Sequence, residues 1–172
     1  MKPIERYSLQ VLPAWYPFRA FKRRLVRDGK PTWVVVDGDE IAAQFLCGAF
    51  TIFVTNYDYF DGVRTWFHLI DDEGRVRDIV STPDYFGFLQ DVESPAELEL
   101  NFGFYGTNDQ WSLRICERPV WSFRIGDLRS RVNRFLFTQR RLMLGCTKGE
   151  PWLFQPAEPD APVDAAASQR RH

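Results

Sequence analysis

The sequence has little of what most enzymes use to move protons or to activate a nucleophile. Among its 172 residues are only two histidines, His68 and His172, although histidine is the most frequent general acid or base in catalysis. Gly-x-Ser-x-Gly elbows, Walker loops, dinucleotide fingerprints and His-Glu-x-x-His pairs are absent. His68 lies between Phe67 and Leu69, a setting typical of a histidine packed within a sheet. We therefore expect no catalytic residue and no enzymatic activity, with a general-base role for His68 as the less favoured alternative.

Cysteines and long apolar runs are also scarce. The three cysteines, Cys47, Cys116 and Cys146, are widely spaced and form no Cys-x-x-Cys pattern, which disfavours a disulfide framework and a zinc site. We expect each to be a small buried hydrophobic residue, and we expect neither a metal nor a cofactor. No apolar leader is present in residues 1–10, and no stretch approaches the roughly 18 apolar residues of a membrane span. These absences predict a cytoplasmic protein without membrane contact.

What is present indicates a folded β protein. Hydrophobic residues make up 45% of the chain and aromatic residues 16%, unlike a disordered chain. The length suits one hydrophobic core, so we predict a single β-rich domain over residues 1–154 and a flexible tail over 155–172. The expected class is mainly β (β-rich α+β). It would be an antiparallel meander sheet or sandwich with one or two short helices.

Turn residues divide the middle of the chain into strands. Asp37-Gly38-Asp39 separates the apolar runs 33–36 and 40–46, which predicts a hairpin because an Asp-Gly step tolerates positive φ. A second hairpin is predicted around residues 71–74, between runs 64–70 and 75–80. Alternating or β-branched residues predict further strands at 50–57, 98–104, 111–116 and 121–125. The apolar segment 135–144 favours a strand as well, with a helix as the open alternative.

Helical signals are fewer. Phe18, Phe21 and Leu25 recur at helical spacing among arginines and lysine, which predicts a short basic amphipathic helix over 18–27, with a basic strand as the alternative. A helical turn is expected near 85–91. A short helix is expected over 127–134, where Asp127 would be the N-cap.

Charge is distributed unevenly along the chain. Residues 1–32 contain 8 basic and 2 acidic side chains, residues 33–110 contain 3 and 15, and residues 111–154 contain 9 and 3. The formal net charge of −1 therefore hides an acidic middle between basic flanks. Either the flanks fold against the middle and form internal ion pairs, or the middle presents carboxylates that attract a basic partner.

Aromatic residues occur in two acidic turns, 57–61 and 83–86, where folding alone would not require them. They favour the interpretation in which the acidic middle attracts a basic partner. The hypothesis is that these turns, with the acidic turn at 71–73, hold a partner protein through aromatic anchors. The predicted partner-binding residues are Tyr57, Asp58, Tyr59, Phe60, Asp61, Asp71, Asp72, Glu73, Asp84, Tyr85 and Phe86.

The sequence thus favours a small cytoplasmic protein that binds and occludes the basic functional surface of another protein. A bacterial immunity protein that neutralises a toxin or effector would have these properties. Two alternatives stay open. One is a carboxylate-dependent hydrolase, with Asp37, Asp39 and Glu40, or Asp58 and Asp61, as the acidic groups. The other is a nucleic-acid-binding or scaffold module that uses the arginine-rich segments 19–27 and 129–141.

Overall fold

The structure is a computed structural model that describes residues 1–17, 19–60, 62–83, 87–123 and 137–149. Within these ranges the chain forms strands and a single 3-10 turn, η1 (Arg19–Phe21), and no α-helix. The strands are β1 (Lys2–Pro3), β2 (Tyr7–Val11), β3 (Lys22–Arg27), β4 (Lys30–Asp37), β5 (Glu40–Cys47), β6 (Phe50–Tyr59), β7 (Gly62–Asp71), β8 (Val76–Ser81), β9 (Leu89–Ala96), β10 (Glu99–Phe104), β11 (Gln110–Phe123) and β12 (Phe137–Thr147).

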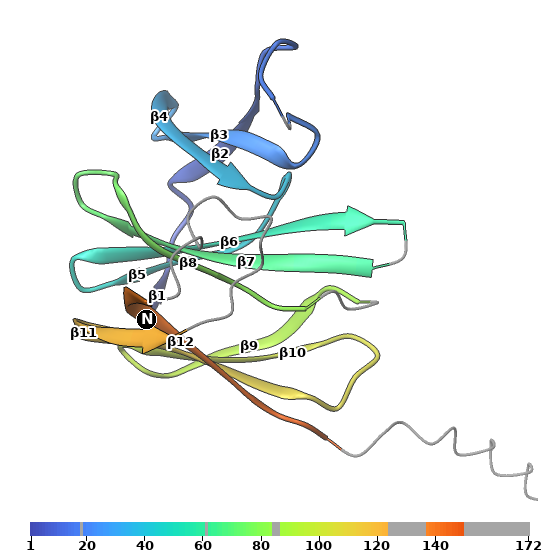
Figure 1. The fold of residues 1–172 in the computed structure, drawn as a ribbon, viewed down its shortest axis with the longest axis vertical. Coiled ribbons are helices and arrows are strands. Elements are labelled where there is room, and N and C mark those ends of the chain that lie inside the picture. Colours follow the sequence, from blue (N-terminus) through green and yellow to red (C-terminus); the bar gives the residue numbers. More distant parts are fainter. Residues whose placement is uncertain (18, 61, 84–86, 124–136, 150–172) are drawn as a thin grey trace, which may run out of the picture.

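The strands form three sheets that stack as three layers (Figure 1). The middle sheet has the order β1-β5-β6-β7-β8. A three-stranded sheet, β2-β3-β4, covers one of its faces, and a four-stranded sheet, β12-β11-β10-β9, covers the other. Strand pairing is antiparallel in all three sheets. The predicted class, a mainly β antiparallel sandwich, is confirmed.

The middle sheet is buried on both faces, which explains the apolar sequence of its central strands. On β6, Ile52 and Val54 belong to the cluster shared with the four-stranded sheet, whereas Phe53 belongs to the cluster shared with the three-stranded sheet. On β7, Phe67 faces the first cluster and Ile70 the second. All are fully buried, and each such side chain contributes about 2 kcal/mol of transfer free energy. A strand buried on both sides needs no polar face.

The Asp37-Gly38-Asp39 turn connects two layers and does not close a hairpin. Residues on both sides of it form strands as predicted, but β4 pairs with β3 and β5 pairs with β6, so the predicted hairpin is wrong. An Asp-Gly step determines only the local backbone, while pairing depends on which edges are free and which faces are apolar. Gly38 has φ +94°, and a Cβ there would lie 2.6 Å from Thr55 Cβ. The crossing chain lies directly against β6.

The predicted helix over 18–27 is also wrong. Beyond the turn at Arg19–Phe21 the segment forms β3, the alternative strand, because β2 and β4 pair with it on both sides. Only Leu25 of this strand is fully buried. The helical turn expected at 85–91 is contradicted from Leu89 onward, where β9 begins. Residues 84–86, the predicted helix at 127–134 and the predicted flexible tail at 155–172 lie outside the described residues.

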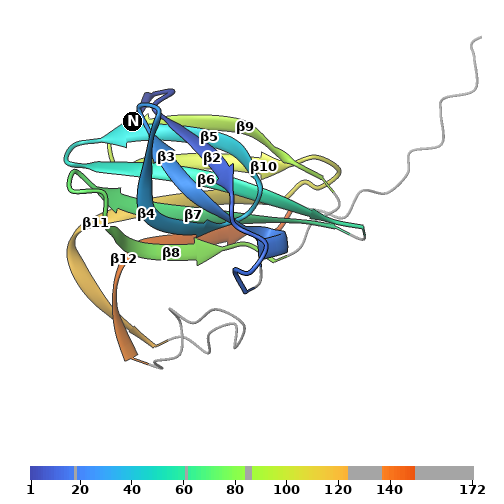
Figure 2. The same cartoon turned by 90° about the horizontal axis from the view of Figure 1, so that it is seen from above.

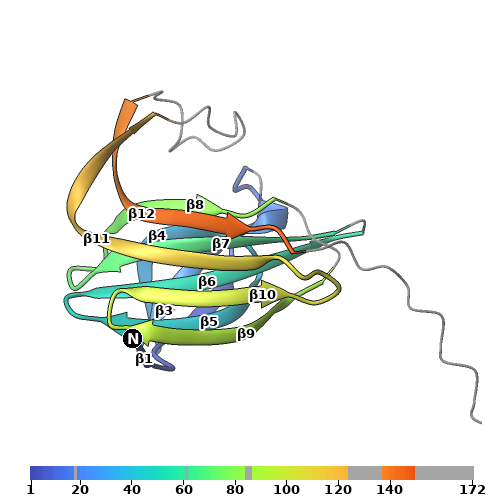
Figure 3. The ribbon, with the colours of Figure 1, turned by 90° about the horizontal axis from the view of Figure 1, so that it is seen from below.

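The remaining predicted strands are confirmed where the structure describes them. The turn at 71–74 closes the β7–β8 hairpin as predicted. Residues 111–116 and 121–123 belong to one long strand, β11, whose register shifts between Ile115 and Val120. Beyond this shift β11 and β12 leave the sandwich together as a two-stranded ribbon (Figures 2 and 3).

A buried ion pair joins the middle and four-stranded sheets along one side. Asp78 on β8 and Arg140 on β12 have side chains only 3% and 5% exposed, and Arg140 Nη1 donates to Asp78 Oδ1 at 2.8 Å. The backbone N–H groups of Arg141 and Leu142 donate to Asp78 Oδ2 at 2.8 and 2.9 Å. The carboxylate thus takes the place of an adjacent strand for β12, next to which β8 lies (Figure 3).

Candidate functional site

Two tyrosines and a phenylalanine gather at the tip of the β6–β7 hairpin. Tyr57 and Tyr59 alternate with Asp58 on β6, so both side chains lie on the same side of the sheet. Their rings meet edge to face, with the ring centres 4.7 Å apart. The ring of Phe21 also meets that of Tyr57 edge to face, with the ring centres 6.0 Å apart. Phe60 follows the strand and is fully exposed. The tyrosines are held in place by neighbours, whereas Phe60 projects from the fold.

Two further aromatic residues lie at the same end of the molecule. Phe88 precedes β9 and Tyr105 follows β10, and Tyr105 N donates to Phe88 O at 3.0 Å. Their side chains are 48% and 71% exposed. Both lie where the four-stranded sheet ends beside the β6–β7 tip (Figures 1 and 3). Neither residue was predicted from the sequence, although each adjoins a turn glycine, Gly87 or Gly106.

We call this surface the aromatic end. It comprises Tyr57, Tyr59, Phe60, Phe88 and Tyr105.

Exposed carboxylates accompany the aromatic end. Asp58 is exposed, and so is Glu40, which pairs in register with Asn56 near the end of β6. Neither forms an ion pair with another described residue. Arg64 is the nearby cation, with its guanidinium 6.0 Å from the centre of the Tyr59 ring. Asp58 and Glu40 are thus exposed carboxylates of this end without an ion pair to a described residue.

The acidic loop predicted at 84–86 is outside the described residues, as is Asp61. The described chain locates both ends of that loop. Thr82 N donates to Thr65 O at 3.0 Å, and a Cβ at Gly87 would overlap the backbone of Tyr105. Gly87 therefore lies against Tyr105, at the aromatic end.

The third predicted segment, 71–73, lies at the opposite end of the molecule. Strand β7 spans ten residues, which places its two ends about 30 Å apart. Asp71 accepts hydrogen bonds from Arg75 N at 2.8 Å, Arg75 Nε at 3.1 Å and Arg77 Nε at 2.6 Å. Burial raises the pKa of Asp71, but these bonds outweigh it and hold the pKa below its ordinary value. Glu73 pairs with Arg75. Asp72 is exposed and has no ion pair with a described residue. The structure thus divides the predicted site into two separate surfaces.

The acidic middle is partly neutralised by the basic flanks. Among the described residues, carboxylates of the middle pair across this boundary in Lys22–Asp37, Arg23–Asp39, Arg114–Glu99 and Arg140–Asp78. Others are exposed and have no ion pair with a described residue: Glu40, Asp58, Asp72, Asp91, Glu93 and Glu97. Some carboxylates of the acidic middle are therefore neutralised by the basic flanks, whereas others are exposed without an ion pair to a described residue.

Some of the groups expected to serve the two alternative functions are engaged with each other, whereas Glu40 and Asp58 are exposed and have no ion pair with a described residue. Asp37 and Asp39, candidates for a hydrolase, bind Lys22 at 2.5 Å and Arg23 at 3.4 Å. The two arginine-rich segments lie in different outer layers, β3 in the three-stranded sheet and β12 in the four-stranded sheet. Residues 129, 131 and 134 lie outside the described residues.

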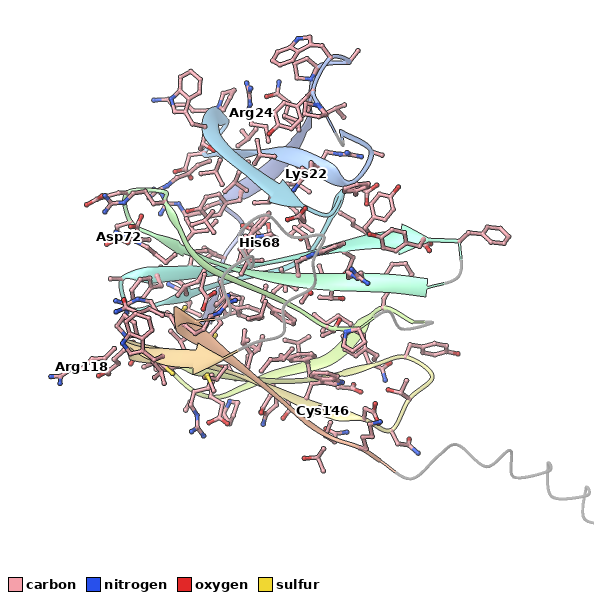
Figure 4. All side chains as sticks on the ribbon, in the orientation of Figure 1. Lys22, Arg24, His68, Asp72, Arg118 and Cys146 are labelled. Atoms are coloured by element: carbon pink, nitrogen blue, oxygen red, sulfur yellow. The ribbon has the colours of Figure 1, made fainter. Side chains whose placement is uncertain are left out.

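His68 lies fully buried in the middle layer (Figure 4). Thr55 Oγ1 donates to Asp37 O at 2.5 Å and lies 3.0 Å from His68 Nε2. Since the hydroxyl hydrogen is used by Asp37, Nε2 donates to Thr55 and holds the ring proton. Nδ1 has no partner among the described residues. Burial lowers the pKa of His68 to about 4, so the ring is neutral and belongs to the core, as expected.

The cysteines differ in exposure. Cys47 is buried, and burial raises the pKa of its thiol to about 11. Cys116 is half-buried and Cys146 is exposed, so the prediction of a buried residue is wrong for Cys146, which lies on an edge strand. Among the described ranges, no three His, Cys, Asp or Glu side chains gather closely enough to hold a metal ion. No helix in the described part of the chain has the length and apolar character needed to cross a membrane.

Comparison with known proteins yields no family model that matches the chain, and no curated protein or solved structure matches it either.

Proposed function

We propose that this chain binds another protein through the aromatic end and acts by occluding the surface it covers. One observation carries the proposal. Phe60, Phe88 and Tyr105 come from three separate segments, all lie at one end of the molecule, and all are exposed. Phe60 in particular buries nothing in the fold, so folding does not account for its position. Exposed aromatic side chains gathered on one surface are typical of interface hot spots.

The charge of the aromatic end supports a basic partner. Asp58 and Glu40 are exposed and unpaired among the described residues, and Asp61 and Asp84 follow in the adjoining turns of the sequence. Such carboxylates increase the association rate with a positively charged surface. The specific form of the proposal is an immunity protein of the bacterial cytoplasm that neutralises a toxin or effector stoichiometrically. That activity requires occlusion and no catalytic residue.

The test compares two exposed aromatic residues on different layers. Phe60→Ala removes the anchor, while Trp33→Ala removes the equally exposed indole of β4, which is 97% exposed and lies on the three-stranded sheet. Partners are captured from the native host with each variant and identified by mass spectrometry. A partner that binds the wild type and Trp33→Ala should dissociate about thirtyfold faster from Phe60→Ala, the loss of about 2 kcal/mol expected of a hot spot. If Phe60→Ala and Tyr105→Ala both retain the partner as well as the wild type does, the proposed surface is refuted.

A second experiment examines the carboxylates. Asp58→Asn combined with Glu40→Gln should slow association and reduce its dependence on salt, while leaving dissociation nearly unchanged, because exposed charges act mainly on the encounter. The control is Glu93→Gln combined with Glu97→Gln. These residues are also exposed and unpaired, on or just after β9. If the two pairs of substitutions alter association equally, the field of the whole protein and not the aromatic end attracts the partner.

A further inference from the structure

The opposite end of the molecule contains a cavity of about 360 Å³. It lies between the β5–β6 turn, the β7–β8 turn and β12, at the end of the molecule that Asp72 marks in Figure 4. Its walls include Phe50 and Ala49 on one side and three arginines, Arg75, Arg77 and Arg141, on the others. A cavity of this size with one apolar wall and a few converging polar groups is suited to a small ligand.

Two of the arginines keep donors free for a ligand. Arg77 Nε donates to Asp71 at 2.6 Å, and the Nη groups of Arg77 make no hydrogen bond with a described residue. Arg141 lies over the Phe50 ring, 5.3 Å from its centre, and its Nη1 donates to Glu117 O at 2.7 Å. It has no carboxylate partner among the described residues. In both cases one part of the guanidinium fixes the side chain and the rest remains available.

The carboxylates that line the cavity differ in whether an arginine already binds them. Asp71 is 11% exposed and engaged by both Arg75 and Arg77, and Glu73 is paired with Arg75. Asp72 is exposed and forms no ion pair with a described residue. Its carbonyl group accepts a hydrogen bond from Arg27 Nη1 at 2.9 Å, which holds the turn through the backbone and leaves the carboxylate unengaged. Asp72 is therefore the only lining carboxylate free to oppose an incoming anion.

We propose that this cavity, the arginine pocket, binds a small molecule that carries a phosphate monoester, through Arg77 and Arg141. The two guanidiniums come from different strands, β8 and β12, and therefore approach a ligand from different directions. A planar carboxylate is satisfied by one guanidinium fork, whereas the oxygens of a phosphate point several ways and accept from two. The Phe50 and Ala49 wall is the surface for the organic part. The pocket lies at the far end from the aromatic end, so this inference does not depend on the proposed function.

The test is calorimetric titration of the full chain with phenyl phosphate at constant ionic strength, with inorganic phosphate and acetate as comparison ligands. Arg77→Ala and Arg141→Ala should each weaken phenyl phosphate binding about tenfold or more, the effect of losing a charge-assisted hydrogen bond. Asp72→Asn should strengthen binding several-fold, because it removes the opposing charge and leaves the Arg27 bond to the backbone. Arg114→Ala is the control, since that exposed arginine of β11 lies outside the pocket and should leave binding unchanged.

Several outcomes would overturn the inference. Absence of saturable phenyl phosphate binding to the wild type would do so, as would equal binding by the wild type, Arg77→Ala and Arg141→Ala. Acetate that binds as tightly as phenyl phosphate would show that the pocket does not select phosphate. Asp72→Asn changes only an exposed side chain, so it keeps the test informative if an arginine variant fails to fold. Weaker binding by Asp72→Asn would place the ligand elsewhere.

Discussion

Replacing Asp78 should reveal how strongly one side chain joins the two sheets. Asp78→Ala leaves the Arg140 guanidinium, 5% exposed, without its carboxylate. It also leaves the N–H groups of Ile79, Arg141 and Leu142 without their acceptor. Removing one partner of a buried ion pair costs about 3–5 kcal/mol, and each buried donor left unsatisfied adds about 1 kcal/mol or more. We expect Asp78→Ala to lower the free energy of unfolding by at least about 6 kcal/mol.

Urea unfolding followed by tryptophan fluorescence measures this loss, and a matched pair of substitutions isolates its cause. Arg140→Met should cost about 3 kcal/mol. Arg114→Met, which breaks the exposed pair with Glu99 at 3.9 Å, should cost less than about 0.5 kcal/mol. Combining Asp78→Ala with Arg140→Met should destabilise by less than the sum of the two, because the double variant leaves no charge buried.

Two results would refute this reasoning. One is a loss below about 1 kcal/mol for Asp78→Ala, and the other is equal losses for Arg140→Met and Arg114→Met. Either would mean that the pair does not hold the sheets together. If Asp78→Ala does not fold, the two methionine variants still provide the comparison.

Two further predictions concern the middle sheet. The pKa of His68 is lowered to about 4 from 6.5, so the unfolded chain binds a proton first as pH falls. Stability should therefore decrease by up to about 3 kcal/mol between pH 6.5 and 4. His68→Gln should reduce that decrease in urea unfolding, and an unchanged profile would contradict the assignment. Gly38→Ala should cost about 3 kcal/mol, because strain at positive φ adds to overlap with Thr55. Gly74→Ala, with φ +79° and open space, should cost only about 1 kcal/mol. If the two substitutions lower the free energy of unfolding equally, overlap of the new Cβ with Thr55 does not contribute at Gly38.

Local chemistry allowed much of the strand pattern to be predicted. The β7–β8 hairpin follows from its turn, and the alternation of β10 follows from Leu100, Phe102 and Phe104, which all face the core. The turn at Gly38 shows the limit of this reasoning. Its sequence indicates a change of direction, but the partner of each flanking strand depends on edges and faces contributed by residues elsewhere in the chain. The basic segment that forms β3 became a strand for the same reason, since two neighbours pair with it.

The candidate site shows the same division. Tyr57, Tyr59 and Phe60 could be selected from the sequence because aromatic residues in a turn have no obvious structural purpose. Phe88 and Tyr105 could not be added to them, since the pairing of β9 with β10 brings these two residues together. The stacking of the sheets then places them at the end of the molecule where the β6–β7 tip lies. The turn at 71–73 resembles the aromatic turns only in its acidic composition. The length of β7 separates the two, and Arg75 and Arg77 engage Asp71.

The sequence by itself determined that this protein is mainly β with an uneven distribution of charge, because periodicity, turn chemistry and composition act over a few neighbouring residues. The tertiary structure decided how many layers there are, which carboxylates are neutralised and which remain free. Those outcomes depend on contacts between residues far apart in the chain, such as Asp78 with Arg140. The charges of the acidic middle could be counted in advance. Their division between internal ion pairs and exposed surface required the packing of all three sheets.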